Sequence, residues 1–120
     1  MAASFKELIV WQKAMDLVAE TYIIAKRLPN EEKYALSDQM RRAAVSIPSN
    51  IAEGQVRNST KEFMNFLSIA RGSNAELQTQ LLVCIRLGYL TEKEIERASG
   101  LSEEVGKMLQ TIIQKLTTDY

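Results

Sequence analysis

Apolar residues recur at alternating spacings of three and four along most of the chain, which is the spacing of an α-helix. No stretch alternates apolar and polar residues long enough to predict a strand. The first predicted helix covers residues 6–27 and carries two neighbouring apolar seams. The first seam is Leu8, Trp11, Met15, Val18, Tyr22 and Ala25. The second seam is Val10, Ala14, Leu17, Ile24 and Leu28. Together the seams cover about 200° of the helix, more than the roughly 100° that a surface helix buries, so we expect a second burial surface.

Turn and capping residues set the limits of three further helices. Leu28-Pro29 ends the first helix, because the residue before a proline is pushed out of the helical conformation. The second helix is predicted from Glu31 or Tyr34 to Glu53, with Gly54 as its C-terminal stop. The third covers residues 60–87 and is closed by Gly88. The fourth opens at Thr91-Glu92-Lys93-Glu94, a capping box.

Each of these helices has one inward seam. In the second helix the seam is Leu36, Met40, Ala43, Ile47 and Ile51. In the third it is Phe63, Leu67, Ala70, Asn74, Leu77, Leu81 and Cys84. In the fourth it is Ile95, Ala98, Ser102, Val105, Leu109, Ile112 and Leu116. Four helices with short connections predict an all-α, antiparallel up-down-up-down four-helix bundle, a single domain over residues 1–120 with an ordered core at about 5–117.

Residues 41–54, Arg-Arg-Ala-Ala-Val-Ser-Ile-Pro-Ser-Asn-Ile-Ala-Glu-Gly, place a proline inside the second helix. Proline removes one backbone hydrogen bond and clashes with the carbonyl four residues back, so we expect the helix to be kinked near Pro48 and held by packing. The run is also rich in small residues, which let another backbone approach closely: Ala43, Ala44, Ser46, Ser49 and Ala52.

Composition removes several classes of function. Histidine is absent, which takes away the usual general base and metal ligand, and no phosphate-binding glycine loop or nucleophile motif is present. The single cysteine, Cys84, lies in an apolar seam and is expected to be a buried, inert thiol. We expect no cofactor, no metal and no enzymatic activity; catalysis by Glu53, Glu76 or Asp38 is a distant third hypothesis.

The chain is expected to be cytoplasmic. No apolar run approaches the roughly 20 residues that cross a bilayer, and the N-terminus lacks the pattern of a secretory signal. Basic and acidic residues number fifteen each, which argues against a surface that is basic all round. The balanced charge therefore argues against nonspecific binding of nucleic acid by the whole surface.

Five cations are candidate contacts for nucleic acid or a protein partner: Arg41, Arg42, Arg57, Lys61 and Arg71. Arg41 and Arg42 point about 100° apart on a helix, so at most one of them faces the interior. The alternative to a partner contact is that these arginines form a salt bridge with Asp38, Glu53 or Glu76. For Asn74 and Glu76 we favour a structural role, in which buried polar groups fix the register of the helices.

Self-association is the main prediction from the apolar pattern. Two seams on the first helix and a small-residue face on the second leave more apolar surface than one bundle of this size buries. The residues assigned to packing or to contacts between copies are Trp11, Ala44, Pro48, Asn50, Glu53 and Glu76.

The chain resembles the four-helix-bundle family of bacterial intervening-sequence proteins, which are encoded within ribosomal RNA genes. The resemblance covers about residues 5–116, and its most specific element is the 41–54 run. Further elements are residues 8–14, Leu28-Pro29 with residues 32–36, the segment that starts at Gln39, residues 66–73, Glu76-Leu77 and Leu87-Gly88-Tyr89. The same family includes the accessory variability determinant of diversity-generating retroelements.

The resemblance implies a ring-shaped homopentamer without enzymatic activity or a small-molecule substrate. It also implies RNA or a reverse-transcriptase-like protein as partner, because the retroelement members are similar to nucleic-acid binders with basic outer surfaces. Those members are strongly basic and this chain is neutral. The balanced charge favours the alternative, a structural or protein-interaction ring with no nucleic-acid role.

Overall fold

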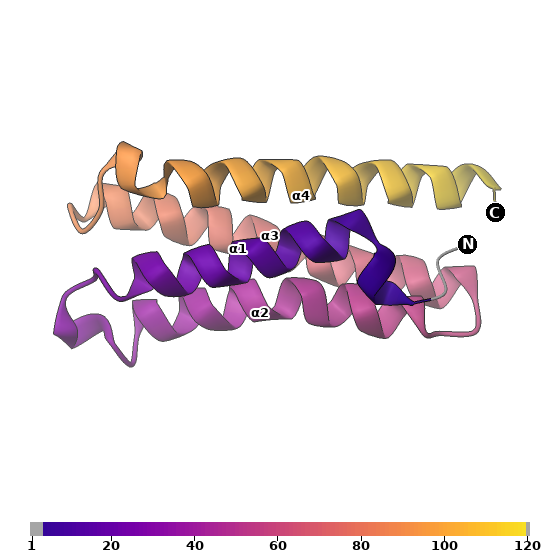
Figure 1. The fold of residues 1–120 in the computed structure, drawn as a ribbon, viewed down its shortest axis with the longest axis horizontal. Coiled ribbons are helices and arrows are strands. Elements are labelled where there is room, and N and C mark those ends of the chain that lie inside the picture. Colours follow the sequence, from indigo (N-terminus) through magenta and orange to yellow (C-terminus); the bar gives the residue numbers. More distant parts are fainter. Residues whose placement is uncertain (1–3, 120) are drawn as a thin grey trace.

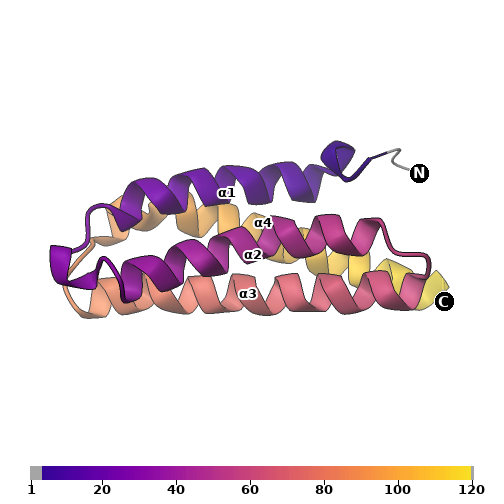
Figure 2. The same ribbon diagram turned by 90° about the horizontal axis from the view of Figure 1, so that it is seen from below.

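Four long helices form an antiparallel bundle in the structure, a computed structural model that describes residues 4–119. The long helices are α1 (Ile9–Ala25), α2 (Leu36–Gln55), α3 (Thr60–Arg86) and α4 (Glu92–Asp119), with 3-10 turns η1 (Phe5–Glu7) and η2 (Asn30–Glu32). The bundle measures 45 × 22 × 20 Å. The α1–α2 and α3–α4 connections lie at one end, and the α2–α3 connection lies at the other (Figures 1 and 2). The predicted all-α four-helix bundle is confirmed, since the described residues contain no strand.

The first helix begins later than predicted. Ser4 caps η1 by accepting a hydrogen bond from the N–H of Lys6 at 3.2 Å, and Leu8 then adopts an extended conformation. Gln12 reaches back from α1 and donates to the carbonyl of Lys6 at 2.9 Å, which holds the short turn in place. The predicted helix over 6–27 is therefore wrong at its start, because local side-chain hydrogen bonds favour a separate turn before Ile9.

The second helix also begins later, at Leu36. Glu32, at the end of η2, accepts a hydrogen bond from the N–H of Leu36 at 3.3 Å through one oxygen and from the hydroxyl of Tyr89 at 2.8 Å through the other. The predicted start at Glu31 or Tyr34 is wrong because Glu32 is used to bridge two connections. One carboxylate thus joins the α1–α2 connection to the α3–α4 connection.

Gly54 does not end the second helix, which continues to Gln55. A Cβ built at Gly54 would lie 2.7 Å from Cβ of Phe66 and 3.0 Å from the ring of Phe63. The prediction of a C-terminal stop is wrong, and the reason for glycine is close packing of α2 against α3. No larger side chain fits there without a shift of the two helices.

The predicted end of the third helix and the predicted start of the fourth are confirmed, whereas the first helix ends at Ala25, two residues earlier than predicted. Gly88 follows α3 with φ of 77°, a conformation that glycine adopts without strain. Thr91 and Glu94 form the predicted capping box: the N–H of Glu94 donates to the Thr91 hydroxyl at 3.2 Å, and the N–H of Thr91 donates to Glu94 at 3.0 Å. The hydrogen bonds that the Glu94 carboxylate accepts from the N–H and the hydroxyl of Thr91 lower the pKa of Glu94, with a further contribution from Arg27.

The core contains most residues of the predicted seams of the second, third and fourth helices, together with the second seam of the first helix. The seam residues that are only partly buried and pack against the core are Leu36, Phe63, Ile112 and Leu116. Its largest fully buried side chains include Leu17, Ile24, Met40, Leu77 and Leu109. On α1, by contrast, the first seam is only partly covered: Met15 is 43% exposed and Tyr22 is 40% exposed. The prediction of additional apolar surface on the first helix is confirmed within the single chain.

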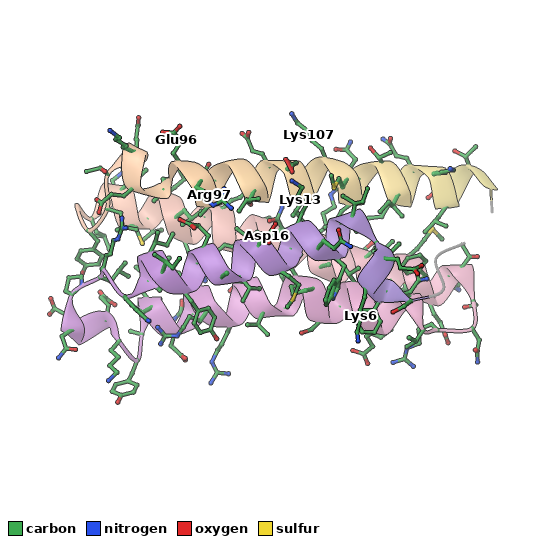
Figure 3. The ribbon with its side chains drawn as sticks, in the orientation of Figure 1. Lys6, Lys13, Asp16, Glu96, Arg97 and Lys107 are labelled. Carbon is green, nitrogen blue, oxygen red and sulfur yellow. The ribbon has the colours of Figure 1, made fainter. Side chains whose placement is uncertain are left out.

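Two ion pairs of opposite sign connect α1 to α4, and a third joins Arg27, just after α1, to α4. Lys13 pairs with Glu104 at 3.1 Å, Glu20 with Arg97 at 3.5 Å, and Arg27 with Glu94 at 3.4 Å. Lys13 and Arg97 lie between the two helices (Figure 3). Each pair contributes at most about 1 kcal/mol. The Lys13 and Glu20 pairs have opposite sign and lie about two helical turns apart, so a shift by that distance would place like charges together, and the pairs favour this register.

Candidate nucleic-acid and self-association surfaces

The five candidate cations do not form one site. Arg41 and Arg42 lie in the second turn of α2, whereas Arg57 and Lys61 flank the α2–α3 connection at the opposite end of the bundle. Sixteen residues separate Arg41 from Arg57, which is about 24 Å at the rise of a helix. Arg71 lies near the middle of α3. A single nucleic-acid strand would have to run along the bundle to contact both pairs.

Arg41 and Arg42 both pair with Asp38. The Nε of Arg42 lies 2.9 Å from one carboxylate oxygen, and a guanidinium nitrogen of Arg41 lies 3.9 Å from the other. The side chain of Arg42 is 80% exposed and that of Arg41 is 24% exposed, so the prediction that one of them points outward is confirmed. The alternative of a salt bridge with Asp38 is also confirmed. Two cations share one anion here, which leaves a local excess of positive charge.

Arg57 is oriented by two contacts at the other end of the bundle. Its guanidinium donates to Glu53 at 2.9 Å and lies 4.7 Å above the centre of the Phe66 ring. Lys61, one residue into α3, is exposed and forms no ion pair with the residues that the structure describes. At this end of the bundle Arg57 is held in a fixed orientation, and the exposed Lys61 side chain is available to an anion.

Arg71 and Glu76 lie on the exposed surface of α3. Arg71 borders a shallow groove between α3 and α4 that also contains Glu103 and Lys107, so the groove has mixed charge. The register role predicted for Glu76 is not supported within one chain because its side chain faces solvent. The register role predicted for Asn74 is supported: it is 3% exposed and hydrogen-bonded to Ser102 on α4.

A partly exposed apolar surface follows α1, and we call it the Trp11 stripe: Trp11, Met15, Val18 and Tyr22. Trp11 is half-buried and stacks edge-on against Phe5, with ring centres 5.4 Å apart. Tyr22 shares the wall of a cavity with Val45 of α2, which is 39% exposed. The stripe therefore extends across the boundary between α1 and α2.

The residues around Pro48 pack within the chain. Ala44 and Pro48 are buried, and α2 remains helical through the proline; the kink stays a prediction. Ser46 exchanges a 2.8 Å hydrogen bond with Ser73 of α3, and Asn50 donates to the carbonyl of Ser46 at 2.8 Å. Ser46 contacts α3, and Ala43 and Ala44 are buried, which fits the packing role predicted for this run. Ser49 is exposed, so the predicted packing role is not supported for it within one chain.

Cys84 has the buried environment that was predicted for it. Its side chain is fully buried, its thiol donates to the sulfur of Met40 at 3.6 Å, and burial raises the pKa of the thiol to about 11. A nucleophilic role requires a lowered pKa, so this thiol is unreactive. Among residues 4–119, no group of three or more acidic or cysteine side chains is placed to hold a metal ion. No described helix combines the length and apolar character that a membrane span requires.

Sequence reasoning missed a basic cavity where α1 ends and α2 begins. The cavity has a volume of about 420 Å³, and Lys26, Lys33 and Arg41 are among its lining residues. Lys26 and Lys33 lie in the α1–α2 connection and Arg41 lies in α2, so no local motif relates the three. A count of cations on both sides of Leu28-Pro29 was the only available signal.

Comparison with known proteins identifies a family and a similar solved structure. The family model described as 23S rRNA-intervening sequence protein matches residues 6–111. A crystal structure of a protein of unknown function, from the S23 ribosomal protein family of Bacteroides thetaiotaomicron, has a TM-score of 0.81 to this chain at 32% sequence identity. That match covers 88% of this chain and 98% of the crystallised chain. No curated protein matches.

Proposed function

This chain belongs to the 23S rRNA-intervening sequence protein family, and we propose that it is a non-catalytic homo-oligomer that binds RNA or a ribonucleoprotein partner. The single observation that carries the RNA part of this proposal is membership of a family whose name refers to ribosomal RNA. We propose a cytoplasmic location for the assembly, as expected from the sequence. Neither a cofactor nor a small-molecule substrate enters this function.

The exposed apolar side chains support self-association. Ile9, Tyr34, Val56, Leu82 and Leu87 are each more than half exposed, in addition to the Trp11 stripe. Burial of apolar surface contributes about 25 cal/mol for each Å², so a second copy that covers the stripe gains free energy without any change in the fold. Five copies in a ring follow from the family resemblance alone.

The positions of the cations support RNA contact at two places. Arg41 and Arg42 form one group, and Arg57 and Lys61 form the other. The rise of a helix places the two groups about 24 Å apart. In a ring of identical copies each group would be repeated, so a neutral chain can still present a circle of positive charge. Phosphate contacts of this type give affinity without sequence specificity.

The test of RNA binding is a salt series. Anisotropy of a labelled, structured RNA is measured with the intact protein between low and physiological salt. We expect the affinity to fall steeply as salt rises, because each phosphate contact releases counterions. The variant Arg57→Ala/Lys61→Ala should bind the RNA more weakly and with a shallower salt slope. The control variant Lys107→Ala/Lys115→Ala removes the same charge from α4 and should bind the RNA as the unmodified protein does. Equal affinities for the two variants, or no binding at low salt, would contradict the proposal.

The second candidate is a structural or protein-interaction ring with no nucleic-acid role. The equal numbers of basic and acidic residues favour it, because they provide no overall attraction for a polyanion. An oligomer that shows no RNA affinity at low salt would select this candidate. Enzymatic activity is not part of either proposal.

A further inference from the structure

We propose that the cavity between the end of α1 and the start of α2 binds the phosphate group of a nucleotide. Three basic residues, Lys26, Lys33 and Arg41, are among those that line this cavity. None of its lining residues within the described part of the chain is acidic. A cavity lined by basic residues and by no acidic one attracts an anion, and phosphate matches both lysine and arginine donors.

Arg41 is already held in position for such a ligand. A guanidinium nitrogen donates to the carbonyl of Lys33 at 3.1 Å, and the guanidinium carbon lies 5.9 Å from the centre of the Tyr22 ring. Within residues 4–119 Arg41 pairs with the carboxylate of Asp38, which lies 3.9 Å away and is bonded more closely to Arg42. Arg41 therefore retains donors for a ligand, and little side-chain freedom remains to be lost when it binds.

The two lysines add positive charge beside Arg41, and the Nζ of Lys33 lies 5.5 Å from the centre of the Tyr34 ring. Lys26 and Lys33 form no ion pair within residues 4–119. The carbonyl of Ala25, at the C-terminal end of α1, would repel an anion if it were free. It accepts hydrogen bonds from the hydroxyl of Ser37 at 3.1 Å and from the N–H of Leu28 at 3.4 Å, so its lone pairs are occupied.

The size and the remaining walls of the cavity fit more than a phosphate ion. A volume of about 420 Å³ falls within the range of roughly 300–1,000 Å³ that is usual for small-ligand sites. Tyr22, Leu28 and Pro29 provide apolar and aromatic surface beside the cations. Phosphate at the cations with a sugar and base against these side chains describes a nucleotide, either free or as one unit of an RNA strand.

This inference goes beyond the proposed function, because the cavity is complete within one chain and needs no second copy. Of its three cations, only Arg41 was a candidate contact from the sequence. If RNA is the source of the phosphate, the cavity binds one nucleotide of the strand, while Arg57 and Lys61 contact the strand elsewhere.

The experiment is isothermal titration calorimetry on the intact protein with two probes, uridine 5′-monophosphate and a single-stranded uridine octamer. Uridine without phosphate is the control ligand. The pocket variant is Lys26→Ala/Lys33→Ala, and the matched control variant is Lys107→Ala/Lys115→Ala, which removes two exposed lysines from α4. We expect the pocket variant to weaken binding of a phosphate-bearing probe about ten-fold or more, equivalent to 1.4 kcal/mol, and the control variant to leave it unchanged. Circular dichroism checks that both variants keep the helical fold.

The two probes distinguish the source of the phosphate. Binding of the monophosphate, lost in the pocket variant and absent for uridine, assigns the cavity to a free nucleotide. Binding of the octamer alone, with the same loss, assigns it to an RNA strand. The inference is overturned if neither probe binds the unmodified protein, or if the pocket variant binds both as well as the control variant does. Octamer binding that depends on Arg57 and Lys61 but not on the pocket lysines would leave the proposed function intact and remove this inference alone.

Discussion

Asn74 and Ser102 exchange two hydrogen bonds across the buried interface of α3 and α4. The Ser102 hydroxyl donates to the side-chain oxygen of Asn74 at 2.7 Å, and the Asn74 amide donates to the carbonyl of Ser102 at 3.0 Å. Gly106, one turn further along α4, leaves room for this amide: a Cβ there would lie 3.1 Å from its nitrogen. The pair satisfies polar groups in an otherwise apolar seam, and it does so only in one register of the two helices.

Replacing Asn74 by leucine should destabilise the fold although it makes the core more apolar. The variant leaves the buried Ser102 hydroxyl without this acceptor, and an unsatisfied buried polar group costs about 1–3 kcal/mol. Chemical denaturation measures the loss. The double variant Asn74→Leu/Ser102→Ala should recover a large part of it, and a double variant as unstable as the single one would argue against a specific pair.

Alanine substitutions at two helical glycines should have opposite effects. At Gly54 the new Cβ would lie 2.7 Å from Cβ of Phe66, so Gly54→Ala should destabilise the protein by about 1–3 kcal/mol through overpacking. At Gly72 nothing lies within 4 Å of the new Cβ, so Gly72→Ala should stabilise α3 by up to about 1 kcal/mol. Thermal unfolding compares the two. An equal response at both sites would contradict the close approach of α2 and α3 at Gly54.

The Cys84 thiol should react slowly and should make stability depend on pH in the alkaline range. Burial raises its pKa from 9.0 to about 11, so the native state holds the thiol proton more tightly than the unfolded state. Its contribution is fully present below pH 9 and is lost as pH rises through about 11, by up to about 3 kcal/mol in all. Denaturation at pH 8 and at pH 10.5 measures the change, with Cys84→Ala as the variant that should show a smaller one. Rapid labelling by a disulfide reagent under native conditions at pH 8 would show that the thiol is accessible.

Replacing Pro48 by alanine should disturb assembly more than helix content. Pro48 is buried and lies one turn from Val45, which borders the Trp11 stripe. Alanine restores a backbone N–H and allows α2 to straighten, which would shift this surface. Circular dichroism should remain unchanged while the oligomer mass falls; Ser49→Ala, an exposed neighbour, is the control. An unchanged mass in the proline variant would refute the link between the proline and assembly.

Apolar spacing was sufficient to predict the helices and the core, because a four-helix bundle buries one continuous seam of each helix. The second seam of the first helix, the Asn74 position and the Thr91–Glu94 capping box all follow from spacing and capping rules that act over a few residues. The errors arose where a distant residue decides the local structure. Gly54 read alone is a helix stop, and only the position of Phe66 on α3 makes it a packing residue.

The candidate site was less accessible to sequence reasoning for the same reason. The pairing of Arg41 and Arg42 with Asp38 could be considered because all three lie within one helical turn. The basic cavity requires knowledge of how the α1–α2 connection folds back, since this brings Lys26 and Lys33 beside Arg41. For self-association, the sequence offers only an excess of apolar surface, which predicts that copies associate but not which residues meet.

The mass of the protein in solution tests the central claim most directly. Light scattering coupled to size-exclusion chromatography at micromolar concentration should give a multiple of the 13.6 kDa chain, about 68 kDa for the five copies that the family resemblance implies. The variant Met15→Glu/Val45→Glu, which places charge on the exposed apolar surface of α1 and α2, should reduce this mass while the helical signal is retained. A mass of 13.6 kDa for the unmodified protein at that concentration would contradict the claim that the exposed apolar side chains are covered by further copies.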